Sequence, residues 1–282
     1  MSIQLITSPE DMQAMVMQWH REGLTIGFVP TMGNLHEGHL QLVETAKQKA
    51  DRVVVSIFVN PLQFGPNEDF AKYPRTLEDD IKRLEVLKVD EVFAPAEESF
   101  YRQERERLTY VEVPGLSDIL CGATRPGHFR GVTTVVNKLF NIVQPDVAVF
   151  GRKDYQQLAI IRQMVEDLAM PVSLVGLETV RESDGLAMSS RNRFLSAEQR
   201  ALAPKLYQSL QSLRQTLREG EKAYEKLREQ TTEWLTEQGF RVDYLEIRDA
   251  RSLQWPDANT GERVILTAVY LGETRLIDNI LV

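Results

Sequence analysis

His36 and His39 lie three residues apart in a turn that also contains Gly33 and Gly38. An apolar run, 24–29, precedes the turn, and a stretch with helical periodicity follows it, so the order is buried strand, turn and helix. The first turn of a helix offers unpaired N–H groups and a partial positive charge, which suit a phosphate. Two imidazoles at this spacing lie on nearly the same face and can reach one group.

A plainer interpretation of these histidines competes with phosphate binding. A single histidine near a helix start more often only hydrogen-bonds a neighbour. The chain contains four histidines, however, and two of them share this one turn between a strand and a helix. We therefore interpret the turn as a phosphate-binding site.

Two later segments carry cationic and hydroxyl groups. Gly151-Arg152-Lys153-Asp154 follows a second apolar strand, and Lys153 can meet a phosphate as a point charge. Asp154 can accept a hydrogen bond from a ribose hydroxyl, or it can simply cap the next helix. The segment Ser189-Ser190-Arg191 combines two hydroxyls with a guanidinium, as a phosphate clamp does, although such a triplet also occurs by chance in loops.

Gln63 follows another apolar strand, 52–59, in a long loop that spans residues 60–75. Its amide group both donates and accepts, so it can orient a hydroxyl or a carboxylate. The alternative is a solvated loop residue. A loop of this length can also close over a site as a lid.

These segments are connected by alternating strands and helices up to about residue 180. The pattern predicts a doubly wound parallel sheet, in which ligands bind at the carboxyl ends of the strands. The loops 30–39, 60–75 and 151–154 all fall at such ends. The predicted strands are 3–7, 24–29, 52–59, 91–94, 146–150 and 172–175, and the predicted helices are 9–21, 40–50, 76–88 (capped by Thr76), 131–143 and 154–168.

The pattern changes after residue 180. Two helices, 196–220 and 221–239, precede three strands, 241–248, 264–271 and 274–280, with a hairpin turn at Gly272-Glu273. We therefore expect a domain of residues 1–180 that holds the nucleotide and the acid substrate. A smaller α+β domain of residues 181–282 is expected to close over the site.

Composition narrows the possible functions. The 282 residues carry a net charge of −8, which argues against a general nucleic-acid-binding protein. Cys121 is the single cysteine, so no intrachain disulfide can form. No apolar run reaches the length of a membrane span, and no basic and hydrophobic leader opens the chain, so we expect a cytoplasmic protein with no membrane association.

Taken together, the motifs resemble the nucleotidylyltransferase superfamily, which shares a His-x-Gly-His signature with class I aminoacyl-tRNA synthetases. Within that superfamily, the chain most resembles the pantothenate synthetase (pantoate–β-alanine ligase) family, and the similar segments span essentially the whole sequence. These segments are 30–39, 58–64, 73–76, 125–132, 153–158, 189–192 and 276–279.

The resemblance implies a Rossmann-like fold and a reaction in two steps. Pantoate attacks the α-phosphate of ATP to give pantoyl adenylate and pyrophosphate, and the amine of β-alanine then attacks the acyl carbon to give pantothenate and AMP. The implied ligands are ATP, Mg²⁺, pantoate and β-alanine, with no nucleic acid, and the implied assembly is a homodimer.

The resemblance also implies roles for individual residues. The catalytic group would be His36, His39, Lys153, Ser189, Ser190 and Arg191. Gln63 and Gln157 would bind pantoate, Gln63 would also bind β-alanine, and Asp79 would position Mg²⁺. The ATP site would be Met32, Gly33, Asn34, Leu35, His36, Glu37, Gly38, His39, Gly151, Arg152, Lys153, Asp154, Val180, Met188, Ser189, Ser190 and Arg191.

One departure from the family pattern and two rival functions remain. Arg152 stands where the family usually has Glu or Gln, which leaves a backbone contact possible but questions any side-chain role. The near rival is another adenylate-forming or nucleotidyl-transferring enzyme. The rival from a different class is a nucleotide-binding sensor without catalysis.

Overall fold

A computed structural model of the protein describes residues 3–66, 68–104, 107–257 and 260–282. The chain divides into two compact units. The first comprises residues 1–152 and 160–177, and the second comprises residues 153–159 and 178–282.

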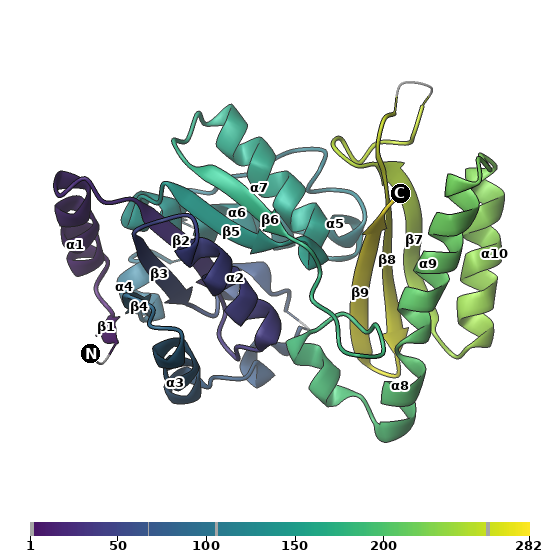
Figure 1. Cartoon of the computed structure of the whole chain (residues 1–282), viewed down its shortest axis with the longest axis horizontal. Coiled ribbons are helices and arrows are strands. Elements are labelled where there is room, and N and C mark those ends of the chain that lie inside the picture. The colour runs from purple at the N-terminus through teal and green to yellow at the C-terminus, as the bar shows by residue number, and fades with distance from the viewer. Residues whose placement is uncertain (1–2, 67, 105–106, 258–259) are drawn as a thin grey trace. The chain divides into compact units, whose positions relative to one another are not determined.

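The first unit is built on a six-stranded parallel sheet (Figure 1). The strand order is β1-β4-β3-β2-β5-β6, and every pair in it is parallel. Strands buried on both faces require continuous apolar runs, and Val53, Val54 and Val55 of β3 are at most 1% exposed. The strands are β1 (Gln4–Ile6), β2 (Ile26–Thr31), β3 (Arg52–Ile57), β4 (Glu91–Phe93), β5 (Val147–Gly151) and β6 (Ser173–Leu177).

Helices cover both faces of this sheet. Helix α2 packs across β2, β3 and β5, whereas α6 contacts β2 and α1, and Figure 1 shows α2 and α6 on opposite faces. The helices of this unit are α1 (Pro9–Arg21), α2 (Glu37–Lys47), α3 (Leu77–Val86), α4 (Glu97–Phe100), α5 (Cys121–Thr124) and α6 (His128–Val143), with 3-10 turns η1 (Pro61–Gln63) and η2 (Asp69–Lys72). The 3-10 turn η4 (Arg152–Asp154) and helix α7 (Tyr155–Asp167) contain residues of both units.

The order of the strands reverses at β2. From β2 the chain builds outward through β3 and β4 on one side, and it later returns to add β5 and β6 on the other. In a doubly wound sheet, a ligand binds in the crevice outside the carboxyl ends at such a point. The turn that carries His36 and His39 follows β2, and Gly151 ends the neighbouring strand β5.

The second unit contains a three-stranded antiparallel sheet, β7-β8-β9. Helices α9 and α10 contact each other and pack on β9 and β7, respectively, as Figure 1 shows. Its core includes Leu206, Leu210 and Leu235 of the helices together with strand residues. The elements are η5 (Ser190–Phe194), α8 (Ala197–Leu202), α9 (Lys205–Arg218), α10 (Tyr224–Glu237), β7 (Arg241–Asp249), β8 (Arg263–Leu271) and β9 (Thr274–Leu281).

The predicted fold class is confirmed, with local corrections to the bounds of helices. The predicted helix 196–220 is broken into α8 and α9 near Pro204, which has no N–H to continue the ladder of hydrogen bonds. The helices predicted from residues 40 and 131 begin earlier, at Glu37 and His128, so His39 and His128 lie inside first turns. The predicted hairpin at residues 272–273 is confirmed by the pairing of Leu271 with Thr274.

Glu91 is a buried carboxylate at the first residue of β4, at the end of the strand opposite to its carboxyl end. It pairs through its backbone with Gln4 of β1 and Val54 of β3, and its Oε2 has no hydrogen-bond partner among the described residues. Burial, reinforced by the negative charge of Asp90, raises the pKa of Glu91 to about 7.

We expect Glu91→Gln to remove a pH-dependent loss of stability. Between the ordinary pKa of 4.5 and about 7, the folded state binds the Glu91 proton more tightly than the unfolded state does. Raising the pH through this range therefore destabilises the native protein. Urea unfolding gives the free energy of unfolding of both proteins at pH 5 and at pH 8. Between these two pH values, the free energy of unfolding of the variant should rise relative to that of the native chain by about 1–3 kcal/mol, the scale for an unsatisfied buried group. A difference that does not change with pH would contradict the assignment.

Candidate active site

A buried carboxylate holds the turn that follows β2. Asp80 of α3 accepts hydrogen bonds from the backbone N–H groups of Asn34 (2.9 Å) and Leu35 (2.7 Å). Gly33 and Asn34 both have positive φ, +79° and +52°. A Cβ on Gly33 would come within 3.0 Å of both Asp80 Oδ2 and the Ile57 side chain, so this position requires glycine. The turn is therefore a fixed structure rather than a loose connection.

Thr76 contributes to the same arrangement in a way that differs from the prediction. It occupies the N-cap position of α3, but its side chain makes no capping hydrogen bond. Its hydroxyl instead donates to Asp80 Oδ2 at 3.1 Å. Asp80 thus accepts from one side chain and two backbone groups, and its carboxylate is oriented toward the turn.

The two histidines lie against each other at the start of α2. Their ring centroids are 4.0 Å apart, with a tilt of 42°. The backbone N–H of His36 donates to Nδ1 of His39 at 3.2 Å. A nitrogen that accepts a hydrogen bond does not carry a proton, so a neutral His39 carries its proton on Nε2. The ring therefore presents an N–H donor on the side opposite the backbone contact, the group that a phosphate oxygen requires.

Gln63 is built into the first unit rather than solvated. Its side chain is about nine-tenths buried, its Nε2 lies 3.0 Å from Met32 Sδ, and its Oε1 accepts from Asn60 Nδ2 at 3.1 Å. Asn60 in turn donates to the carbonyl of Gly131 and accepts from the Tyr101 hydroxyl. The solvated-loop alternative for Gln63 is therefore wrong.

The backbone of Gln63 is also held by side chains of residues 125 and 128. Nδ1 of His128 lies 2.7 Å from the Gln63 carbonyl oxygen, and Arg125 Nη2 donates to the same oxygen at 3.3 Å. Arg125 also forms two hydrogen bonds of 2.6 Å with Glu68. Burial raises the pKa of the Glu68 carboxyl, but the hydrogen bonds and charge of Arg125 outweigh it and lower the pKa overall. The Glu68 carboxyl is therefore ionised at neutral pH.

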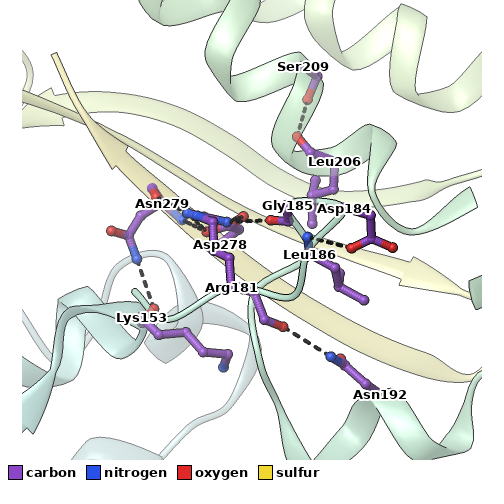
Figure 2. Close-up of polar contacts among 11 residues, drawn as sticks. Lys153, Arg181, Asp184, Gly185, Leu186, Asn192, Leu206, Ser209, Asp278 and Asn279 are labelled. Atoms are coloured by element: carbon purple, nitrogen blue, oxygen red, sulfur yellow. Dashed lines mark hydrogen bonds and ion pairs between the residues drawn. The ribbon is translucent and has the colours of Figure 1, made fainter. Parts of the chain in front are cut away.

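In the second unit, the described contacts of Lys153 join it to β9. The Lys153 carbonyl oxygen accepts from Asn279 Nδ2 at 2.8 Å, and its Nζ lies 3.8 Å from Asp154 Oδ2. Gln157 follows one turn later, at the start of α7. Figure 2 shows the Lys153 side chain extending away from the Asn279 contact.

Residues 180–188 form a hairpin that leads into the serine segment. The Met188 N–H donates to the Val180 carbonyl at 2.9 Å, so the two predicted ATP-binding positions are direct neighbours. Ser189 then caps η5 by accepting from the Arg191 N–H at 3.3 Å. Asn192 fixes the other side of this turn through hydrogen bonds to Ala187 and Glu182.

Comparison with known proteins decides the family. A family model described as "Pantoate-beta-alanine ligase" matches residues 4–281. The chain belongs to this family. Similar curated proteins are the pantothenate synthetases of Shewanella halifaxensis, 55% identical over 96% of each chain, and Aeromonas hydrophila, 54% identical over 98% of this chain and 96% of its own.

Solved structures of pantothenate synthetases have the same fold. A structure from Thermus thermophilus has a TM-score of 0.90 and 44% identity, and covers 99% of both chains. A pantoate–β-alanine ligase from Francisella tularensis, complexed with β-γ ATP and β-alanine, has a TM-score of 0.80 and 35% identity, and covers 99% of this chain and 97% of its own. The Rossmann-like fold and the ligase family implied by the sequence motifs are thus confirmed.

For a member of the pantoate–β-alanine ligase family, the geometry adds residues that the sequence did not single out. Asp79, the predicted metal ligand, is exposed and pairs with Lys82 at 2.9 Å, whereas its neighbour Asp80 is buried and orients the turn. Helical spacing alone does not decide which of two adjacent carboxylates faces inward. The role of Asn60 could have been found in the sequence, because a polar residue directly after a buried strand often holds the loop that follows.

We expect Asp80→Ala to slow adenylation by about 10- to 100-fold, because two N–H groups of the ligase turn would lose their acceptor and the histidines would lose their fixed orientation. The measurement is pantoate-dependent exchange of labelled pyrophosphate into ATP. Asp51→Ala is the control, since Asp51 accepts hydrogen bonds from the backbone N–H and the hydroxyl of Thr25, just before the opposite end of β2. Equal rates for both variants would contradict the assignment.

We expect Gly131→Ala to impair pantoate use. A Cβ at Gly131 would lie 2.2 Å from the Leu62 carbonyl oxygen and 2.7 Å from the Gln63 N, so the backbone that carries Gln63 must move. The KM for pantoate should rise by roughly tenfold or more, the scale for misplaced binding groups, with a smaller change in the KM for ATP. Gly65→Ala, in the loop that carries Gln63, is the control, because its Cβ would make only ordinary contacts, at 3.7 Å or more. An unchanged KM for pantoate would show that the Gln63 backbone tolerates the shift.

Proposed function

We propose that the protein condenses (R)-pantoate with β-alanine at the expense of ATP, through pantoyl adenylate, and that the residues described above carry out the phosphate chemistry. The family match over residues 4–281 supports the reaction. The observation that carries the residue assignment is the hydrogen bond from the His36 N–H to Nδ1 of His39, because it fixes which imidazole nitrogen donates.

In the first step, the pantoate carboxylate attacks the α-phosphate of ATP and pyrophosphate leaves. Both reactants are anionic, so their approach is repulsive unless fixed donors offset the charge. Nε2 of His39 donates to a phosphate oxygen, and His36 binds beside it. Lys153 adds a positive charge, and Ser189, Ser190 and Arg191 hold the remaining phosphate oxygens. The turn 32–35, Gly151, Asp154, Val180 and Met188 bind the rest of the nucleotide.

In the second step, the amine of β-alanine attacks the acyl carbon of the adenylate and AMP leaves. Gln63 and Gln157 hold pantoate in both steps, and Gln63 also orients β-alanine. The chemistry is mostly positioning, since neither step needs a covalent enzyme intermediate. Acyl adenylates hydrolyse readily, so closure of residues 60–75 and of the second unit would protect the intermediate from water.

The proposal includes Mg²⁺, which would bind the triphosphate of ATP. No group of three or more His, Cys, Asp or Glu residues in the described part of the chain is arranged to hold a metal ion. Mg²⁺ with a nucleotide often takes only one or two protein carboxylates, the other ligands being phosphate oxygens and water. Exposed Asp79 fits that pattern, and the metal would neutralise charge on the leaving pyrophosphate. Asp79→Asn should then raise the Mg²⁺ concentration required for half-maximal adenylation.

Release of AMP separates the ligase from its rivals. The protein is incubated with ATP, Mg²⁺, pantoate and β-alanine, and each component is omitted in turn. AMP formed in quantity only with both organic substrates supports the ligase. AMP formed with a different acid would favour another adenylate-forming enzyme, and no turnover would favour a nucleotide sensor.

We expect His39→Ala and Lys153→Ala each to lower the adenylation rate by about two to three powers of ten, the cost of losing one donor to the transition state. Stopped-flow or pyrophosphate-exchange kinetics measure this step directly. Gln63→Ala serves as the comparison, because it should weaken pantoate use more than ATP use. Near-normal adenylation in both of the first two variants would remove the proposed phosphate site.

A cytoplasmic homodimer completes the proposal. No described helix has both the length and the hydrophobicity that a membrane span requires. The dimer rests on the family resemblance, and sedimentation equilibrium tests it: a mass near the 32.3 kDa of one chain would contradict it.

A further inference from the structure

Strand β9 carries two adjacent polar residues, Asp278 and Asn279, which are only 3% and 7% exposed. Burial of a carboxylate and an amide is costly unless each finds partners, so their contacts identify what they do. The neighbouring residues Leu276 and Ile280 are buried in the core of the second unit, which fixes the strand in place. The two polar groups are therefore held on a rigid element.

Asp278 binds the hairpin of residues 180–188 through one arginine. Arg181 Nη1 and Nη2 donate to the two oxygens of Asp278 at 2.6 Å and 2.9 Å, which is a bidentate pair. The same guanidinium lies 3.5 Å from the centre of the Tyr207 ring of α9. Burial raises the pKa of Asp278, and its hydrogen bonds to Arg181 oppose that effect. The pair thus joins β9, α9 and the hairpin.

Arg181 also closes the hairpin on itself. Its Nη1 donates to the carbonyl of Gly185 at 3.1 Å, across the turn, as Figure 2 shows. Gly185 has φ +94°, and a Cβ there would come within 2.8 Å of Tyr207. The returning strand of the hairpin ends at Met188 and continues directly into Ser189. The position of the serine segment therefore depends on how Arg181 is held.

Asn279 holds a different segment from the next position of the same strand. Its Nδ2 donates to the Lys153 carbonyl oxygen, at 2.8 Å (Figure 2). Arg181 Nη2 donates to the Asn279 carbonyl oxygen at 3.3 Å, so the two attachments also contact each other. Consecutive residues of a strand are separated by only about 3.3 Å. The lysine and the base of the serine segment are thus attached to one short piece of backbone.

We propose that Asp278 and Asn279 are positioning residues for adenylation: together they set the placement of Lys153 relative to the serine segment 189–191, without touching a substrate. The inference rests on the proposed function of Lys153 and of the serine segment. A displacement of a catalytic group by about 1 Å can cost about 100-fold in rate, so attachment to a common strand has a direct effect on the chemistry.

The test separates the two half-reactions. Adenylation is measured as pantoate-dependent exchange of labelled pyrophosphate into ATP, and the second step as single-turnover attack of β-alanine on synthetic pantoyl adenylate. Asn279→Ala and Asp278→Asn should each slow adenylation by about tenfold or more, and slow the second step by less than about threefold. Equal losses in the two steps would indicate a merely structural role and overturn the proposal.

Asp243→Asn is the matched control for Asp278→Asn. Asp243 of β7 pairs with Arg275 of β9 at 2.7 Å, in the same sheet and with the same chemistry, but that arginine is not part of the hairpin. This variant should leave both half-reactions within about twofold of the native chain. Circular dichroism and urea unfolding establish that each variant is folded. Should Asp278→Asn fail to fold, Asn279→Ala alone decides the question.

A double-mutant cycle distinguishes failure of this inference from failure of the proposed function. If Asn279 acts through Lys153, Asn279→Ala should cost less than about twofold when Lys153 is already alanine, since residues that act as a unit are not additive. A full tenfold cost in the Lys153→Ala background overturns the inference alone. Normal adenylation by Lys153→Ala itself overturns the role of the lysine, and with it this inference.

Discussion

The parallel pairing of β2 with β3 on one side and β5 on the other is the constraint on which the chemistry of the first unit depends. Parallel strands end at the same edge, so the turn after β2 and the glycine at the end of β5 must be neighbours. Parallel strands also need helical crossovers, and α2 begins directly where the β2 turn ends. The N-terminus of α2 and its two histidines are thereby delivered to the reversal of strand order, where such folds bind ligands.

A turn with positive φ angles at the end of a buried strand must have its N–H groups satisfied. In the first unit, Asp80 does this with a single carboxylate. In the second unit, Asp278 holds the hairpin through the side chain of Arg181 instead. In both cases a buried acid on a regular element orients an irregular segment, and that segment leads directly into the residues proposed to bind phosphate. Irregular segments can thus be as fixed as the elements that flank them.

Most of the fold and part of the candidate site could be predicted from the sequence, because periodicity and motif order are local signals. The strands and most helices follow from apolar runs and their spacing, and Gln63 follows from its position after β3. The choice between Asp79 and Asp80 could not be made, since it depends on the rotation of α3 against the β2 turn. The roles of Arg181 and Asp278 depend on contacts between residues 97 positions apart, for which a single sequence contains no local pattern.

The donors of both units are oriented by the protein itself, which matters for a reaction between two anions. A flexible lysine or serine segment would have to be ordered at the moment of reaction, at an entropic cost of about 1–2 kcal/mol for each backbone residue fixed. The His39 ring is instead oriented by the His36 backbone, and the Lys153 backbone is fixed by Asn279. These contacts use Nδ1 of the imidazole and the carbonyl of the lysine, whereas the proposed phosphate contacts use Nε2 and the ammonium group. Orientation is thus supplied by one set of atoms, and the charge stabilisation proposed for the site would come from another.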